Sequence, residues 1–130
     1  MNDDFFREQI DEILKKDPRF PWEAYSFVKS AVSYTSVKLG RNKNLRSERH
    51  VKGVEILSCA AEYAISQFGP MAADVMESWG LRDGMSIGAV VFNMIDAKLL
   101  NASPEDSLED FNVGFDLIKI LREPFESAAR

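Results

Sequence analysis

The chain has 130 residues, of which 45% are hydrophobic and 28% are charged, and its formal net charge is −5. This balance excludes an intrinsically disordered chain and is typical of one folded domain spanning residues 1–130. A lone cysteine, Cys59, excludes an internal disulfide and a cysteine-based zinc site. Its place in an apolar, helical stretch predicts a buried structural thiol.

The N-terminal segment is acidic and lacks the apolar region of a signal peptide. No apolar run approaches the ~20 residues that are needed to span a bilayer. The sequence therefore predicts a cytoplasmic protein that does not act in a membrane.

In chain order, the first expected helix begins at Asp3 or Asp4 and runs to about Lys16, where Asp17-Pro18 ends it. The second begins near Pro21 and ends before Gly40, and its serines, spaced three to four residues apart, mark a polar face. Residues 41–49 show no periodicity and are expected to form an exposed loop.

Further helices are expected over residues 53–68, 70–79, 86–100 and, as a short element, 104–111. Residues 112–121 leave strand and helix open, because alternation and helical spacing overlap there. The fold class is therefore mainly α: a compact bundle of five to six helices, with a short C-terminal β-hairpin as an open alternative.

Apolar side chains recur at helical spacing along these segments, which predicts that one face of each helix is buried. The aromatic side chains occupy positions compatible with a core. The residues expected inside by these patterns include Phe5, Tyr25, Tyr34, Leu39, Val54, Tyr63 and Trp79.

The second half also fits a winged helix, with a helix over 71–79, a turn over 80–84, a second helix ending at Leu100 and a wing over 111–117. DNA-binding domains of this kind carry cations on the second helix and on the wing. Here that helix offers only Lys98 and the wing is acidic, so this surface would repel phosphate.

Several segments resemble an uncharacterised family of small bacterial proteins, and the resemblance covers nearly the whole chain. The family has no assigned activity, so the resemblance implies no reaction. Lys52 departs from the pattern, because relatives carry a small hydroxyl residue that would form a capping box with Glu55. The segments are Phe27-Val28, Arg49-His50-Val51-x-Gly53-x-Glu55, Gln67-Phe68-Gly69-Pro70-Met71-Ala72, Trp79-Gly80, Val91-Phe92-Asn93 and Glu105-Asp106-Ser107-x-Glu109-Asp110-Phe111.

His50 is the only histidine and stands at the end of a basic segment, just before a predicted helix. It is a candidate for proton transfer or ligand binding. The lack of a second histidine and of a carboxylate on a shared helix face favours instead a residue that fixes the loop by hydrogen bonding. The acids at 105–110, with Asp116 downstream, lack the turn glycine of a calcium loop, which favours a solvated helix face. We predict no catalytic, cofactor or metal site.

Charge is unevenly distributed: residues 40–52 hold five bases and one acid, whereas the chain from residue 53 onward holds thirteen acids and five bases. The basic loop and the acidic C-terminal third, from Glu105 onward, are expected to contact each other within one molecule or across a dimer. The predicted function is a non-enzymatic interaction module of the bacterial cytosol that binds a protein partner or self-associates. The alternatives are a winged-helix-like nucleic-acid-binding protein that uses the basic 41–52 loop, disfavoured by the acidic body, and an enzyme organised around His50. The candidate binding surface comprises Arg41, Lys43, Arg46, Arg49, His50, Lys52, Asp106, Asp110 and Asp116.

Overall fold

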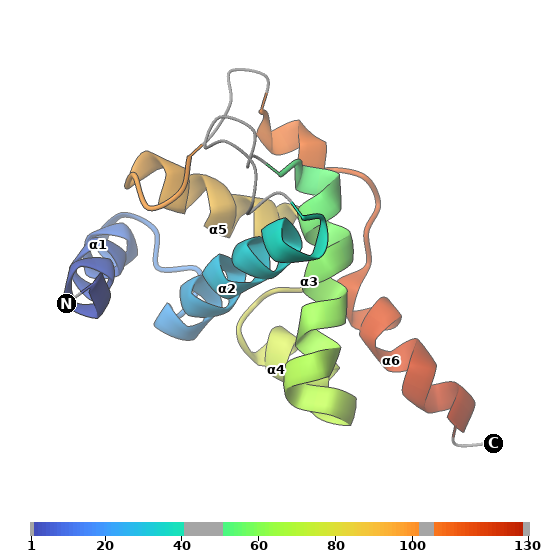
Figure 1. Ribbon diagram of the computed structural model, residues 1–130. Helices are drawn as coiled ribbons and strands as arrows, with labels where there is room; N and C mark the ends of the chain where they lie inside the picture. The colour runs from blue at the N-terminus through green and yellow to red at the C-terminus, as the bar shows by residue number, and fades with distance from the viewer. Residues whose placement is uncertain (1, 41–50, 102–105, 129–130) are drawn as a thin grey trace.

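The computed structural model describes residues 2–40, 51–101 and 106–128 (Figure 1). Within these ranges the chain is helical, and an isolated antiparallel bridge between Asp83 and Asp116 is the sole strand-like pairing. The elements are α1 (Asn2–Lys16), α2 (Trp22–Lys38), α3 (Gly53–Phe68), the 3-10 helix η3 (Gly69–Met71), α4 (Ala72–Ser78), α5 (Gly84–Asp96), the 3-10 helix η4 (Leu108–Phe111) and α6 (Leu117–Ala128).

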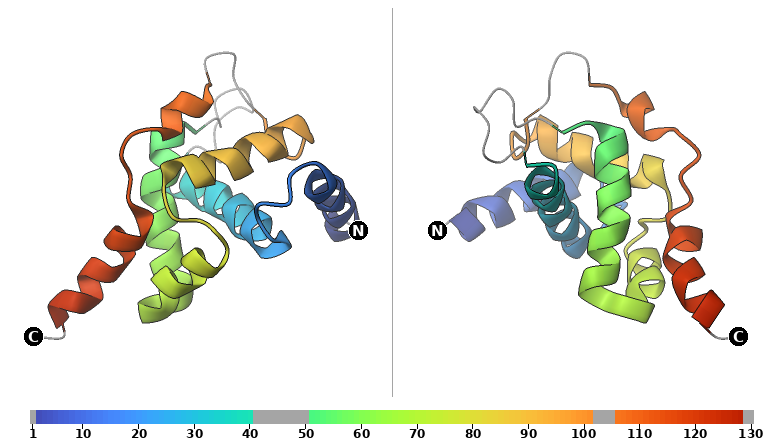
Figure 2. Two further views of the ribbon diagram at one scale, coloured as in Figure 1. Left: turned by 180° about the vertical axis from the view of Figure 1, so that it is seen from behind. Right: turned by 45° about the vertical axis from the view of Figure 1, so that its right-hand side comes forward.

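The helices pack as a bundle around α2, α3 and α5 (Figures 1 and 2). Helix α2 packs mainly against α3 and α5. Helix α1 packs against α2 and α5. Helix α4 lies beside the C-terminal half of α3, and α6 packs on α4. The far end of α6 projects away from the body, so the two termini lie at opposite ends of the molecule.

Helix α5 lies deep in the bundle, because it contacts α2 on one side and η4 on another. Its buried residues are Gly84, Ile87, Gly88, Val90, Val91 and Met94. A helix buried on these faces is not free to enter a DNA groove, so the tertiary packing gives no support to α5 as a recognition helix.

Phe111 is buried in a seat that three glycines create. A Cβ atom at Gly84 would lie 2.3 Å from the carbonyl oxygen of Phe111, and one at Gly88 would lie 2.7 Å from the Cγ of its ring. A Cβ at Gly53 would lie 3.1 Å from the same ring. The glycines therefore let η4 approach α3 and α5 closely, which fixes the start of the C-terminal third on the core.

The sequence left strand and helix open for the C-terminal segment, and the structure has helix α6 over residues 117–128. The alternative of a C-terminal β-hairpin is wrong within the described residues. Gly114 has a φ of 69°, which interrupts an extended strand, and an Oδ1 of Asp116 accepts a hydrogen bond from the backbone of Lys119 at 3.2 Å. This acceptor caps the first turn of α6.

Two other boundaries differ from those expected. Helix α5 ends at Asp96 instead of residue 100, because Lys98 adopts a left-handed backbone with a φ of 63°. The helix expected over 104–111 is the shorter η4, which the Ser107 side chain caps by accepting from the backbone of Glu109. Residues 102–105 lie outside the described ranges.

Some side chains that helical spacing placed in the core face solvent instead. Tyr25 and Cys59 are buried as expected, whereas Phe5, Leu39 and Val54 are exposed. Three further aromatic side chains, Tyr34, Tyr63 and Trp79, are only partly buried. The cause is that α1, α2 and α3 carry apolar residues on more sides than their neighbours cover.

No described helix is long and apolar enough to cross a bilayer.

Candidate functional site

The structure describes four of the nine residues of the predicted binding surface. Arg41, Lys43, Arg46, Arg49 and His50 lie outside the described ranges, which leaves the expected contact between the basic and acidic regions a prediction. The described four are Lys52, Asp106, Asp110 and Asp116.

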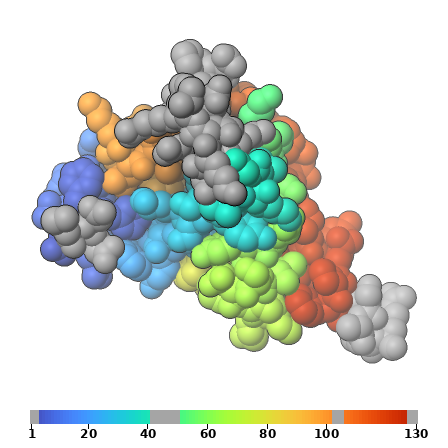
Figure 3. All heavy atoms as spheres, in the orientation of Figure 1, coloured from blue at the N-terminus to red at the C-terminus, as the bar shows by residue number. Residues whose placement is uncertain are grey.

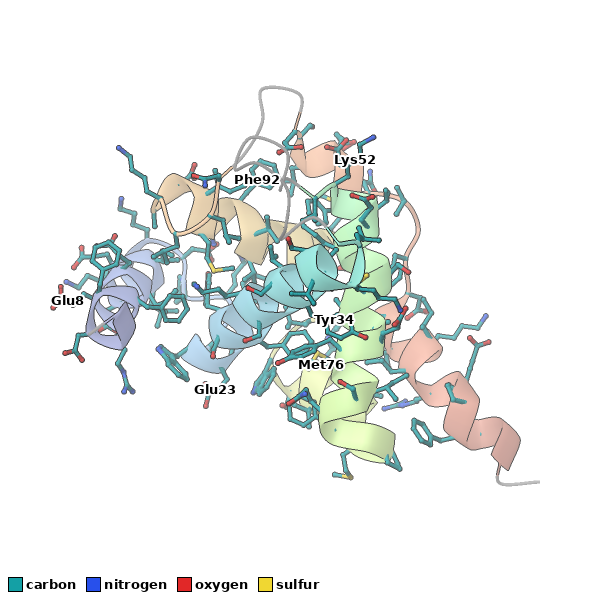
Figure 4. The ribbon with its side chains drawn as sticks, in the orientation of Figure 1. Glu8, Glu23, Tyr34, Lys52, Met76 and Phe92 are labelled. Carbon is teal, nitrogen blue, oxygen red and sulfur yellow. The ribbon has the colours of Figure 1, made fainter. Side chains whose placement is uncertain are left out.

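Lys52 is exposed immediately before α3, at the end of that helix that lies beside η4 (Figure 4). Its backbone N–H donates to Oε1 of Glu55 at 2.8 Å. A lysine side chain has no acceptor for the return bond, so only the Glu55 half of a capping box is present.

Asp106 and Asp110 line one cavity and Asp116 lines another. The first has a volume of about 570 Å³ and lies between α2, the start of α3, α5 and η4. Oδ2 of Asp110 accepts from the backbone N–H of Ser107 at 3.0 Å, so this carboxylate caps η4. Asp116 lines a separate hollow beside Asp83 and caps α6. The predicted acidic surface is therefore divided between two places, and two of its carboxylates stabilise helix ends.

A polar cluster that the sequence did not reveal ties the α1–α2 turn to α5. The amide Nδ2 of Asn93 donates to Oδ2 of Asp17 at 2.9 Å and to the hydroxyl of Tyr25 at 3.0 Å. Arg19 completes it with two bonds to the Asp17 carboxylate, at 2.8 and 2.7 Å. Tyr25 is fully buried, so the cluster satisfies a hydroxyl in the core.

The surroundings of this cluster lower the pKa of its carboxyl group and raise the pKa of its phenol. Hydrogen bonds from Arg19, and then from Asn93, hold the pKa of the Asp17 carboxyl well below its ordinary value. Burial raises the pKa of the Tyr25 hydroxyl. Asp17 therefore stays ionised and Tyr25 stays neutral near neutral pH, an arrangement suited to holding helices together and poorly suited to proton transfer.

A groove follows the solvent face of α2. We call it the α2 groove and define it by the α2 residues along its floor: Trp22, Ser26, Lys29, Ser30, Ser33 and Val37. Its main hollow has a volume of about 760 Å³, and a smaller hollow of about 200 Å³ adjoins it at the Trp22 end. In Figure 3 the atoms of α2 are visible between those of α1 and those of α3.

Aromatic rings form the side of the groove that α3 and α4 contribute. Tyr34 points from α2 towards α3 (Figure 4), and its ring centroid lies 5.3 Å from that of Tyr63. The ring of Phe68 meets the ring of Trp79 edge-on at 5.8 Å. All four rings are partly exposed, so the packed aromatic cluster is also a surface.

Helix α1 and the segment after α5 contribute the opposite side. Phe5 of α1 is 55% exposed there, and Val37 on the floor is 61% exposed. The Lys29 ammonium lies 5.7 Å from the centroid of the Phe6 ring, in cation–π range. Lys98 extends this side beyond the end of α5.

Sequence reasoning identified only part of this groove. The serine spacing on α2 predicted a polar, solvent-facing stripe, and Ser30 and Ser33 are indeed exposed. Helical spacing gave no sign that Phe5 and Val37 would flank that stripe uncovered, because their exposure depends on where α1 and α3 pack. The available signal was the surplus of apolar residues on more than one side of α1 and α2.

Comparison with protein families, curated proteins and solved structures finds no match for this chain. Its function therefore has to be inferred from its own residues. Within the described ranges, no three histidine, cysteine or acidic side chains gather closely enough to hold a metal ion.

Proposed function

We propose that the chain is a non-enzymatic interaction module that binds a helical segment of a protein partner in the α2 groove. The observation that carries the proposal is the pair of large apolar side chains, Phe5 and Val37, that are more than half exposed within one groove. Exposed apolar residues gathered in a concave surface are typical of protein-binding sites, whereas scattered ones are not.

The residue types in the groove support the same function. Trp, Tyr and Phe side chains supply much of the binding energy at protein interfaces, and the wall formed by Tyr63, Phe68 and Trp79 offers three rings that are each packed against the buried Phe27. Rings that are held in place lose little conformational freedom when a partner binds.

The length of the groove suits a helix. The floor runs from Trp22 to Val37, and a rise of 1.5 Å per residue makes this stretch roughly 22 Å long. An amphipathic helix of about four turns would cover it, with apolar anchors at i, i+4 and i+7.

The test is binding of synthetic amphipathic helical peptides of about 15 residues, measured by fluorescence anisotropy with the full chain. The peptides share one apolar face and differ only in whether the polar face is acidic, neutral or basic. We expect saturable binding of at least one peptide. Phe5→Ala with Val37→Ala should weaken it by about tenfold or more, because most of a phenylalanine and a valine side chain would no longer be buried.

The matched control is Val54→Ala with Val113→Ala, which truncates two valines that are similarly exposed but lie outside the groove. This variant should bind as the unmodified chain does. Absence of binding by every peptide, or equal losses in the two double variants, would refute the proposed function.

A further inference from the structure

The main hollow of the α2 groove carries charge opposite to that of the chain as a whole, whereas the smaller hollow at the Trp22 end is lined by the acidic Glu23. The formal net charge of the protein is −5. In the main hollow, however, the charged side chains among the described lining residues are two lysines, Lys29 and Lys98. Both are exposed. Glu62 of α3, which lines neither hollow, accepts from the Tyr34 hydroxyl and forms an ion pair with Lys38, which offsets its charge.

Lys98 occupies a backbone position that disfavours lysine. Helix α5 ends there in a Schellman motif, in which the backbone N–H of Leu99 donates to the carbonyl oxygen of Met94 at 2.8 Å. Such ends take glycine or asparagine, because a Cβ atom is strained at a φ of 63°. Among the described residues, Lys98 alone combines a side chain with a positive φ.

A strained position occupied by lysine is hard to explain by folding stability. Glycine would relieve the strain at Lys98, and the structure shows no ion pair for this lysine within the described residues. Strained residues that bring no gain to the fold are typical of binding surfaces. A glycine at position 98 would remove the ammonium group from the rim of the groove.

We propose that the partner segment recognised by the α2 groove is acidic: an amphipathic helix with carboxylates along one edge. Its apolar face contacts Phe5, Val37 and the aromatic wall, and its carboxylates meet Lys29 and Lys98. This inference rests on the proposed function and adds the charge of the partner. The complementarity sets which helix binds, while the apolar contacts provide most of the affinity.

A nucleic acid is the competing anionic partner, and the groove suits it less well. Two described cations neutralise few phosphates, and the acidic body repels a polyanion at long range.

The decisive experiment compares the acidic and basic peptides of the panel on the full chain. We expect the acidic peptide to bind about tenfold more tightly in low salt, and the preference to shrink as salt screens the charges. Lys29→Glu with Lys98→Glu should invert the preference. Lys119→Glu, a charge reversal at an exposed site on α6, should leave it unchanged.

A milder pair, Lys29→Gln with Lys98→Gln, removes the charge without adding a repulsive one and should abolish the preference while apolar binding persists. Lys98→Gly should raise the melting temperature and weaken acidic-peptide binding. A variant that melts lower and binds fully would contradict the role given to Lys98.

The outcomes separate this inference from the proposed function. Equal binding of acidic and basic peptides overturns the acidic partner and leaves the interaction module standing. Absence of binding by all peptides overturns both. Binding of a single-stranded oligonucleotide more tightly than the acidic peptide, lost in the Lys→Glu variant, would replace a protein partner with a nucleic acid.

Discussion

The aromatic site around Phe111 and the aromatic α2 groove differ in how far their rings are buried. In the η4 seat, Phe111 is 3% exposed and is enclosed by positions where even a Cβ atom would collide. In the α2 groove, Phe5 is exposed and its neighbouring rings are partly so. A closed aromatic site contributes to the stability of the fold, whereas an open one leaves apolar area for a partner to bury.

The largest expected effect is on Phe111. Phe111→Ala should lower the free energy of unfolding by about 3–5 kcal/mol, because it removes a buried ring and leaves a cavity among glycines that have no side chains to fill it. Urea denaturation followed by circular dichroism measures this loss. Phe5→Ala is the matched variant and should change stability by less than about 1 kcal/mol. Similar losses in the two variants would remove the distinction between closed and open sites.

The second prediction concerns Asp17, whose carboxylate is hydrogen-bonded to Arg19 and Asn93. The pKa of Asp17 is lowered in the folded protein, so its stabilising contribution is complete above its unfolded pKa, near 3.8, and is lost as the pH falls below that value. Asp17→Asn should therefore be less stable than the unmodified chain at pH 7, and the difference should narrow as the pH falls through 4 to 2. Thermal melts across this range measure it. A constant difference would mean that the Asp17 charge does not contribute.

The smallest effect is expected from Glu62, on the open side. Lys38 and Tyr34 lower the pKa of this carboxyl through hydrogen bonds, but the side chains of Lys38 and Glu62 are 44% and 45% exposed, so water screens the pair. Glu62→Gln should change the melting temperature less than Asp17→Asn does, and the small change should vanish in high salt. A larger effect than that of Asp17→Asn would show that this surface cluster is structural.

Local patterns predicted the α-helices well because the signals that define helices are local. Proline at position 21 and glycine at positions 40 and 69 set helix ends near where the structure has them. Prediction was weaker where a residue departs from its usual role. The early end of α5 depends on a left-handed lysine, which no propensity favours.

The candidate site was predicted in part. The polar stripe of α2 followed from serine spacing, and Ser30 and Ser33 are exposed on it. The binding surface predicted from the charged residues stays a prediction. Neither the hydrogen bonds from Asn93 to Asp17 and Tyr25 nor the glycine seat of Phe111 could be predicted. They join residues that are far apart in the chain, and a single sequence carries no record of such pairings.

The sequence by itself determined that this chain is mainly helical, because helix hydrogen bonds, caps and breaks form between residues only a few positions apart. It also determined the uneven charge and the absence of a cysteine pair. Tertiary packing alone decided which apolar faces were covered. Helices α3 and α5 enclose most of α2 but leave its serine stripe open between Phe5 and Tyr63, since each helix can bury only the sides that its neighbours reach.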